Sequence, residues 1–319
     1  MMRYSEKKFE LLKKMSNDKG IIAALAIDQR GSMRKMVKGF SDKERDQKIV
    51  SFKKEVSKQL TPYASSILLD PIYGGEAIKA KDQNCGLLMA YEVTGYRDEK
   101  RLPELLSHYS VLRLKELGAD AIKVLLYYDV DDKANNCEKS AFIERIGSEC
   151  EAEGLPFFLE IISYDKNIED SKSKEFAKVK PYKVNSAIKH FSKERYKVDV
   201  LKVEVPVNME YVEGFGEEIV YTREEAKDHF KNQSDNCDIP FIFLSAGVSN
   251  ALFLETLKFA KEAGSQFNGV LCGRATWRDG VEEFIEDEER GRKWLESEGV
   301  DNIQKLNKVL EETAVSWIK

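Results

Sequence analysis

The amino-acid sequence predicts an α/β fold of the (β/α)8, or TIM-barrel, class. Short apolar runs alternate along the chain with longer, charged amphipathic stretches. Strands covered on both faces of a sheet read as nearly continuous apolar runs, so this alternation is typical of a parallel sheet flanked by helices. Eight runs are present, which is the number that closes such a barrel. They span residues 21–28, 65–70, 85–92, 121–128, 157–164, 200–206, 241–247 and 269–274.

An open, doubly wound sheet is the structural alternative to the barrel. Such a sheet usually has fewer strands, and its first strand is commonly followed by a GxGxxG phosphate-binding turn. No GxGxxG follows residues 21–28. The chain also lacks a linker rich in Pro, Gly or Ser, so residues 1–319 are expected to form a single domain.

Helix start and stop signals occupy most of the gaps between the runs. Ser41 can cap a helix that continues to residue 59. Proline is favoured at the start of a helix and glycine just after its end, and these signals predict further helices over 103–118 and 134–153. The link between the second and third runs is short and polar and has the weakest helix signal. Capping residues predict helices after Thr222, Ser249 and Thr276, and helices at residues 6–15 and beyond Glu288 would be additions to the barrel.

The composition limits the classes of function. The net charge of −5 gives no general electrostatic case for binding nucleic acid or an anionic membrane. Five cysteines without CxxC pairing indicate neither a zinc knuckle nor a disulfide framework. The charged N-terminus is unlike a signal peptide, and no apolar run approaches the roughly 20 residues that span a bilayer. A soluble, cytoplasmic protein is expected. The charge runs 165–197 and 282–293 are interpreted as solvated helix faces or loops.

Ionisable residues interrupt several of the apolar runs. Asp28 ends the first run, Lys123 lies inside the fourth, Glu160 inside the fifth, and Lys202 inside the sixth, two residues before Glu204. Desolvating a charged group costs several kcal/mol unless it is paired, so such positions need an explanation. A structural ion-pair network inside the barrel is one explanation. A catalytic site is the other, because active sites of these barrels lie at the C-terminal ends of the strands.

Two lysines beside carboxylates favour imine chemistry over a purely structural core. Strand alternation places Lys123 on the face shared with Leu125 and Tyr127, so it can converge with Glu160 and Lys202 near the barrel mouth. A lysine beside another cation in a partly dry pocket is expected to have a depressed pKa and to supply free amine. A nearby carboxyl group can carry protons during imine formation and hydrolysis.

The last two runs end in turns suited to an anion. FLSAGVSN ends a strand with small residues and starts a helix at Ser249 or Asn250. LCGRATW ends the next strand with Gly273, which allows close approach, and Arg274, which can form a phosphate fork. Loops after the seventh and eighth strands are the recurrent phosphate site of these barrels.

Histidines argue against a metal site. His108, His190 and His229 lie in charged segments without another ligand at metal spacing, so surface positions are expected. A zinc-dependent reaction needs a histidine-rich site and is therefore disfavoured.

Several long motifs, in order, resemble the class I tagatose 1,6-bisphosphate aldolase family of the bacterial tagatose 6-phosphate pathway for lactose and galactose. They are GIIAALAIDQRGSM, SSILLDPIYGGEA, GLLMAYEVTGYR, GADAIKVLLYY, FFLEIISY, DVLKVEVPVN, FLSAGVS and LCGRATW, and they cover nearly the whole chain. The resemblance implies a TIM barrel, no metal or other cofactor, and reversible cleavage of a phosphorylated sugar to dihydroxyacetone phosphate and glyceraldehyde 3-phosphate.

The resemblance also implies roles for individual residues. Lys202 would form the imine with the ketose carbonyl, and Glu160 would be the general acid/base. Asp28 would assist proton transfer at the C4 hydroxyl or carbinolamine, and Lys123 would tune charge and bind substrate oxygens. The remaining matches would contact substrate, the last four of them holding a phosphate largely through backbone N–H groups: Gln29, Arg30, Leu244, Ser245, Gly273 and Arg274.

Two alternatives remain at this point. The substrate could be another ketose phosphate, such as fructose 1,6-bisphosphate or a sulfonated sugar phosphate, since no motif selects the C4 epimer. The barrel could instead serve as a sugar-phosphate-sensing regulator, although the intact Lys202, Glu160 and Asp28 argue against loss of catalysis. A homodimer or a higher homo-oligomer is possible.

Overall fold

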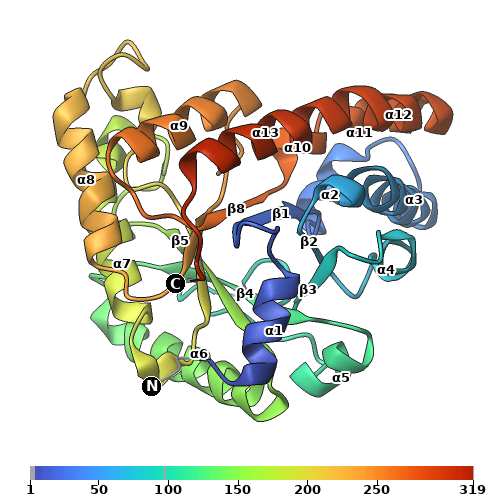
Figure 1. Cartoon of the computed structure of the whole chain (residues 1–319), viewed down its shortest axis with the longest axis horizontal. Helices are drawn as coiled ribbons and strands as arrows, with labels where there is room; N and C mark the ends of the chain where they lie inside the picture. The colour runs from blue at the N-terminus through green and yellow to red at the C-terminus, as the bar shows by residue number, and fades with distance from the viewer. Residues whose placement is uncertain (1–3, 97, 319) are drawn as a thin grey trace.

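The computed structural model describes residues 4–96 and 98–318, and its strands form a closed barrel in the order β1 to β8 (Figure 1). Neighbouring strands are parallel, and β1 pairs with β8 through Ile22 and Gly269 to close the barrel. This confirms the predicted TIM barrel and excludes the open sheet. Each strand lies within its predicted run: β1 (Ile22–Ala26), β2 (Ser66–Leu69), β3 (Gly86–Ala90), β4 (Ala121–Tyr128), β5 (Phe157–Ser163), β6 (Val200–Val203), β7 (Phe241–Phe243) and β8 (Gly269–Cys272).

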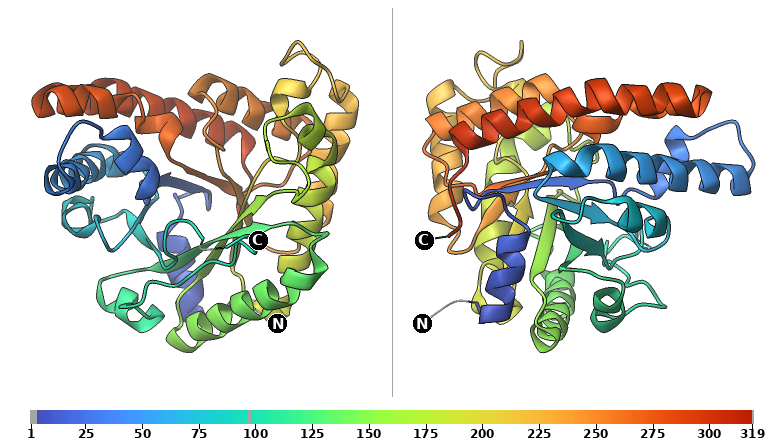
Figure 2. Two further views of the ribbon diagram at one scale, coloured as in Figure 1. Left: turned by 180° about the vertical axis from the view of Figure 1, so that it is seen from behind. Right: turned by 45° about the vertical axis from the view of Figure 1, so that its right-hand side comes forward.

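Helices surround the strands on the outside of the barrel, as both views in Figure 2 show. A helix precedes β1 and a helical extension follows β8, as the sequence predicts. In the extension, α12, a π-helical turn at Leu295–Gly299 and α13 form one continuous run. The helices are α1 (Glu6–Lys14), α2 (Gly31–Met36), α3 (Asp42–Leu60), α4 (Gly75–Ala80), α5 (Val111–Glu116), α6 (Lys133–Glu153), α7 (Lys174–Phe191), α8 (Arg223–Asp235), α9 (Asn250–Glu262), α10 (Arg274–Trp277), α11 (Gly280–Glu286), α12 (Glu288–Trp294) and α13 (Val300–Thr313).

Two predicted helix starts are wrong. The helix expected from Pro103 begins only at Val111, where Ser110 caps it. The preceding segment instead pairs with the chain after β3: the Val93 N–H donates to the Glu104 carbonyl at 2.7 Å, and Glu92 bridges Leu105. Thr276 is not a cap. It lies inside α10, which begins directly after Gly273.

Other predicted caps are confirmed. Ser41 and Thr222 each form a capping box with the glutamate three residues later, and the Ser249 hydroxyl accepts from the Leu252 N–H. These caps fix where α3, α8 and α9 begin, which in turn fixes the loops that reach the barrel mouth.

The charged segment 165–197 differs in part from its prediction. It forms α7, and one face of that helix is buried against β5 and β6. Lys183 on this face is 2% exposed, because three carboxylates surround it. Long aliphatic stems let paired lysines occupy such positions. The second charged segment, 282–293, forms the largely exposed α11 and α12.

Apolar side chains fill the half of the barrel interior that lies toward the N-terminal ends of the strands. One cluster joins inward residues of the strands with Leu12 and Met15 of the N-terminal segment and with Trp317 near the C-terminus. The Trp317 ring meets the rings of Tyr4 and Phe9 at 5.9 and 5.4 Å. The N-terminal end of the barrel is therefore plugged, so only its opposite end can hold an open site. No helix among residues 4–96 and 98–318 is long and apolar enough to cross a membrane.

Candidate active site

The charged residues of the barrel interior form the layer directly above the apolar cluster. In a strand, the side chain two positions after an inward residue also points inward. Ala121, Phe158 and Val200 belong to the apolar cluster. The residues two positions on are Lys123, Glu160 and Lys202. The same step leads from Ala26 to Asp28 and from Ala90 to Glu92.

Lys123 is the centre of this charged layer. Its Nζ lies 2.9 Å from Asp28 Oδ2, 2.8 Å from Glu92 Oε1 and 2.8 Å from Glu160 Oε2. The residue is 2% exposed. Three carboxylates, two just after β1 and β3 and one within β5, thus share one buried ammonium group, which satisfies the three donors of lysine.

The carboxylates keep Lys123 charged. Burial alone would lower the pKa of Lys123, but Asp28, Glu160 and Glu92 outweigh that effect and raise it well above the ordinary value. The expectation of a depressed lysine pKa is therefore wrong for Lys123. Burial opposes ionisation of Asp28 as well, yet Lys123 and Lys202 together lower the pKa of that carboxyl. The layer holds a permanent cation and an ionised aspartate.

Glu160 connects the two lysines. Its Oε1 lies 2.7 Å from Lys202 Nζ while its Oε2 contacts Lys123. Glu160 and Lys202 are direct partners in the pairing of β5 with β6, which explains their contact. Burial raises the pKa of Glu160, but the two lysines overcome this and lower it. Lys202 itself is 5% exposed, and within residues 4–96 and 98–318 Glu160 is the carboxylate that it contacts.

Two cavities open from the charged layer and share the Lys202 and Glu160 side chains. The first, here called the carboxylate-side lobe, has a volume of about 340 Å³ and is lined by Asp28, Lys123 and Arg101 among others. The second, the turn-side lobe, has about 500 Å³ and is lined by the turns after β7 and β8. Residues that line both lobes are Gln29, Tyr127, Glu160, Ile162, Lys202 and Arg274.

The turns after β7 and β8 lie side by side in the turn-side lobe. After β7, Ala246 and Gly247 adopt consecutive left-handed conformations, with φ of 50° and 79°. Successive backbone N–H groups in such turns make anion-binding concavities. The Arg274 guanidinium lies 3.3 Å from the point where a Gly247 side chain would begin. Both predicted anion turns therefore meet at one place.

Individual residues of these turns differ in which groups they can present to a bound anion. Ser245 lines the turn-side lobe and is 8% exposed. Gly273 is required by close approach, since a Cβ there would lie 2.8 Å from the Ala26 carbonyl oxygen. The Leu244 N–H donates to the Val203 carbonyl at 3.0 Å, so the β-sheet occupies that donor.

Gln29 and Arg30 follow Asp28 into the mouth of the barrel. Arg30 is 6% exposed, and its Nη2 lies 3.9 Å from Glu92 Oε1. Its Nε and Nη1 atoms, Gln29 Oε1 and Glu92 Oε2 are buried without a hydrogen-bond partner in the described structure. Buried polar atoms are rarely left unpaired, so a bound molecule or water is expected to complete the hydrogen bonds of this cluster.

Glu92 is a residue of this charged layer that sequence reasoning missed. It is 4% exposed and contacts Lys123, and burial raises its pKa even though Lys123 and Arg30 oppose that effect. The sequence did contain a pattern that could have identified it, because Glu92 ends the third apolar run as Asp28 ends the first. Alternation from the inward Ala90 identifies it.

The predicted surface positions of the histidines are only partly right. His108 is exposed, whereas His190 packs against Tyr128 and lies 2.6 Å from the Tyr196 hydroxyl. Burial lowers the pKa of His190 to about 4. Asp129, Asp131 and Asp165 have metal-like spacing. The Lys183 ammonium group occupies the space between them at 2.6 to 2.8 Å.

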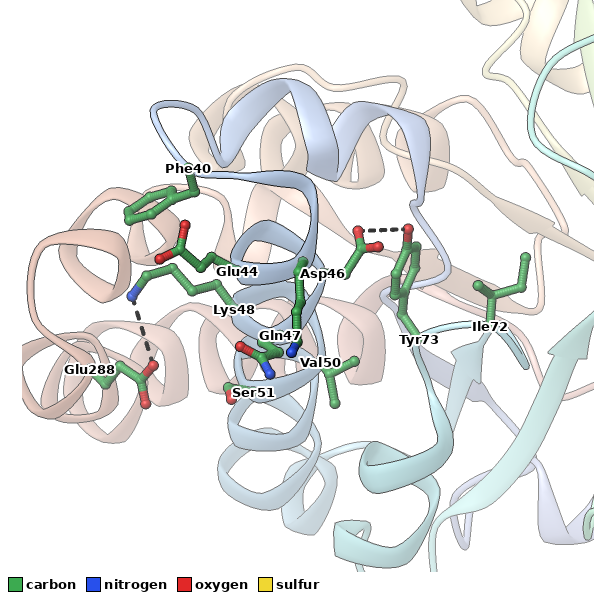
Figure 3. A pocket seen from close by; sticks show the side chains of 11 residues that line it. Phe40, Glu44, Asp46, Gln47, Lys48, Val50, Ser51, Ile72, Tyr73 and Glu288 are labelled. Atoms are coloured by element: carbon green, nitrogen blue, oxygen red, sulfur yellow. Dashed lines mark hydrogen bonds and ion pairs between the residues drawn. The ribbon is translucent and has the colours of Figure 1, made fainter.

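A larger pocket lies away from the charged layer, on the outer face of α3. It has a volume of about 970 Å³, and its polar side chains pair with each other: Tyr73 donates to Asp46, and Lys48 faces Glu288 (Figure 3). It lacks the buried lysines and carboxylates that chemistry at a carbonyl requires. The barrel mouth is therefore the candidate active site.

Comparison with known proteins matches residues 22–279 to the DeoC/LacD family of aldolases. The tagatose 1,6-diphosphate aldolase 2 of Enterococcus faecalis is 59% identical over 99% of this chain and 97% of its own length. A tagatose 1,6-diphosphate aldolase of Staphylococcus aureus is 57% identical over 99% of each chain.

Solved structures share the fold at low identity. The fructose-bisphosphate aldolase of Plasmodium falciparum has a TM-score of 0.70 at 15% identity, covering 98% of this chain and 99% of that one. A Schiff-base-forming fructose-1,6-bisphosphate aldolase has a TM-score of 0.57 at 16% identity, covering 95% and 99%. These similarities confirm the barrel.

Proposed function

This chain belongs to the DeoC/LacD family of aldolases, and we propose that it is a class I enzyme that reversibly cleaves D-tagatose 1,6-bisphosphate to dihydroxyacetone phosphate and glyceraldehyde 3-phosphate. The substrate is taken from the names of relatives that match over nearly the full length. The observation that carries the chemistry is the buried Lys202 amine beside a carboxylate that also contacts a permanent cation.

Imine formation starts at Lys202. Lys202 passes a proton to the Glu160 carboxylate 2.7 Å away, and the resulting amine attacks the C2 carbonyl of the ketose. Glu160 then returns that proton to the carbinolamine hydroxyl, which leaves as water. The product is a protonated imine. Lys123 stays charged throughout and stabilises the carboxylates and the developing oxyanion.

Cleavage of the C3–C4 bond uses this imine as the electron sink. Asp28, held ionised by Lys123 and Lys202, accepts the proton of the C4 hydroxyl as that oxygen becomes the carbonyl oxygen of the aldehyde. The electron pair of the C3–C4 bond moves to the imine nitrogen and leaves an enamine on Lys202. Protonation at C3 and hydrolysis then release dihydroxyacetone phosphate and restore the amine.

The C1 phosphate fits the turn-side lobe. Ser245, the left-handed turn at Ala246 and Gly247, and the Arg274 side chain line one end of it. Lys202 lies at the junction of the two lobes, so a ketose bound through C2 can place its C1 phosphate against these turns. This arrangement supports the placement of Gly273 and Arg274 at a phosphate.

The substrate proposal is tested by steady-state kinetics on the two C4 epimers. We expect the enzyme to cleave D-tagatose 1,6-bisphosphate with a kcat/KM at least equal to that for D-fructose 1,6-bisphosphate. A strong preference for the fructose epimer would overturn the substrate assignment and leave the aldolase class in place.

A further inference from the structure

The two lobes of the active site must hold opposite ends of the substrate. Under the proposed function, C2 is bonded to Lys202 and the C1 phosphate lies in the turn-side lobe. Asp28 and Lys123 line only the carboxylate-side lobe. Because Asp28 serves the C4 hydroxyl, carbons 4 to 6 extend into the carboxylate-side lobe. The phosphate on C6 therefore needs a cationic partner in that lobe.

Arg101 is a cation of this lobe that no carboxylate neutralises. Among residues 4–96 and 98–318, no ion pair or side-chain hydrogen bond engages its guanidinium group. Lys123, by contrast, is shared by three carboxylates. Arg30 also lines this lobe, but its Nη2 faces Glu92 at 3.9 Å and the residue is only 6% exposed, so it is less accessible than Arg101. Arg101 lines the same lobe as Lys202 and is only partly buried, so its N–H groups are accessible to a ligand.

Aromatic rings hold Arg101 in place. Its Cζ lies 4.1 Å from the ring centroid of Tyr164, 5.4 Å from that of Tyr96 and 5.9 Å from that of Tyr127. Tyr96 and Tyr127 also meet edge to face at 5.2 Å. A guanidinium stacked on rings keeps its N–H edges available, and its planar fork matches the oxygens of a phosphate group.

The backbone and the surroundings support the same function. Arg101 has a φ of 52°, a left-handed conformation that is uncommon for a residue other than glycine and that clusters at ligand-binding positions. Behind it, the buried Lys139 donates to the Tyr164 hydroxyl at 3.2 Å. Burial lowers the pKa of Lys139 to about 8, and the charge of Arg101 contributes to that decrease.

We propose that Arg101, stacked on Tyr96, Tyr127 and Tyr164, binds the phosphate on C6 of the ketose and so selects phosphorylated aldehydes. This inference rests on the proposed aldolase function. It adds the residue that distinguishes glyceraldehyde 3-phosphate from glyceraldehyde in the condensation direction. The imine chemistry at Lys202 does not depend on it.

The test compares two aldehydes in condensation with dihydroxyacetone phosphate. In Arg101→Gln, we expect kcat/KM for glyceraldehyde 3-phosphate to fall about 10- to 100-fold, because a charge-assisted phosphate contact is lost. The value for unphosphorylated glyceraldehyde should stay within about twofold of the wild type. Arg101→Lys keeps the positive charge but not the planar guanidinium group, so we expect an intermediate loss of kcat/KM for glyceraldehyde 3-phosphate.

Arg223→Gln is the matched control. Arg223 also stacks on rings, with its Cζ 4.9 Å from the Phe259 centroid and 5.6 Å from that of Phe215, but it lies on α8 outside both lobes. It should leave both aldehydes unaffected.

Two results would overturn the role of Arg101. An equal loss for both aldehydes in Arg101→Gln would show a structural role, and no loss for either would show no role. Failure of the proposed function has a different signature: wild-type protein would then give no borohydride-stable adduct with dihydroxyacetone phosphate, whatever the aldehyde.

Discussion

Lys123 and Lys202 occupy one charged layer but differ in the number of carboxylates that each contacts. Among the residues that the structure describes, Lys123 contacts three carboxylates and Lys202 contacts one. Under the proposed mechanism, this difference assigns the permanent positive charge to Lys123 and the nucleophilic amine to Lys202. It also makes Lys123 important for both stability and catalysis, because its removal leaves Asp28, Glu92 and Glu160 buried without their shared partner.

Substituting Lys123→Met should separate these two contributions. We expect the free energy of unfolding to fall by about 3–5 kcal/mol, the usual cost of breaking a buried ion pair. We also expect kcat to fall by about 100-fold or more, because electrostatic stabilisation of the transition state is lost. Urea denaturation and steady-state kinetics measure the two effects.

Lys183→Met is the control for this substitution. Lys183 is equally buried and also contacts three carboxylates, at 2.6 to 2.8 Å, but it lines neither lobe. It should destabilise the fold comparably while kcat of the folded enzyme is preserved. Equal kcat losses in the two variants would contradict a catalytic role for Lys123.

Glu92 gives a prediction about pH. Burial raises its pKa, with Lys123 and Arg30 opposing the shift, so its ionised form is less favourable in the folded state than in the unfolded chain. The contribution of Glu92 to the free energy of unfolding is fully present below the ordinary carboxyl pKa of about 4.3. It is lost as the pH rises through the higher pKa that Glu92 has in the folded state. Glu92→Gln cannot titrate and should escape this loss.

Denaturation of wild type and Glu92→Gln at about pH 5 and pH 8 tests the sign of that shift. The stability of Glu92→Gln relative to wild type should increase from the lower to the higher pH. A difference that stays constant, or that moves in favour of wild type, would show that the ion pairs with Lys123 and Arg30 dominate over burial.

At the level of elements, the strand ends position the site and the sequence predicted them well. Near-continuous apolar runs marked all eight strands, and charges inside those runs identified Lys123, Glu160 and Lys202. The loop from 91 to 110 was not predictable in the same way. Pro103 carries a helix-start signal, yet backbone pairing with the chain after β3 overrides it. Arg101, which lies in this loop, therefore escaped sequence reasoning.

Gly273 tests the importance of the turn after β8. A Cβ at this position would lie 2.8 Å from the Ala26 carbonyl oxygen and 3.3 Å from Gln29 Nε2, so Gly273→Ala must displace the end of β8. We expect kcat/KM to fall about tenfold or more and the free energy of unfolding to fall by about 1–3 kcal/mol.

Gly75→Ala provides the comparison for Gly273. Gly75 is the first residue of α4, and an added Cβ there would meet nothing within 4 Å. Replacing a helical glycine by alanine should raise stability by about 0.5–1 kcal/mol without a change in kcat/KM. If Gly273→Ala behaved like Gly75→Ala, close packing at the β8 turn would not matter for binding.

For the molecule as a whole, the plug at one end of the barrel leaves the opposite end for chemistry. Trp317 is 7% exposed, and its Nε1 donates to the Ser16 hydroxyl at 2.7 Å. Trp317→Ala should lower the free energy of unfolding by about 3–5 kcal/mol because it opens a cavity in this plug. Since the active site lies at the other end, kcat measured well below the unfolding temperature should be unchanged. A large decrease in kcat would show that the two ends are coupled.

The fold class and the strand positions followed from the hydrophobic pattern, because a closed parallel sheet leaves a strong and periodic signal. Residues whose role depends on three-dimensional pairing were less visible. Lys183 and Lys180 looked like part of a solvated charge run, yet most of the carboxylates that pair with them, on Asp129, Asp131 and Glu204, lie outside that run. No local pattern marks a pairing between distant parts of the chain.

Borohydride trapping tests the central claim, imine formation on Lys202, most directly. The protein is incubated with dihydroxyacetone phosphate and sodium borohydride, and the modified peptide is identified by mass spectrometry. We predict a stable adduct on Lys202 that is absent in Lys202→Ala, together with full cleavage activity in EDTA. An adduct found only on Lys123, or cleavage that EDTA abolishes, would contradict the mechanism.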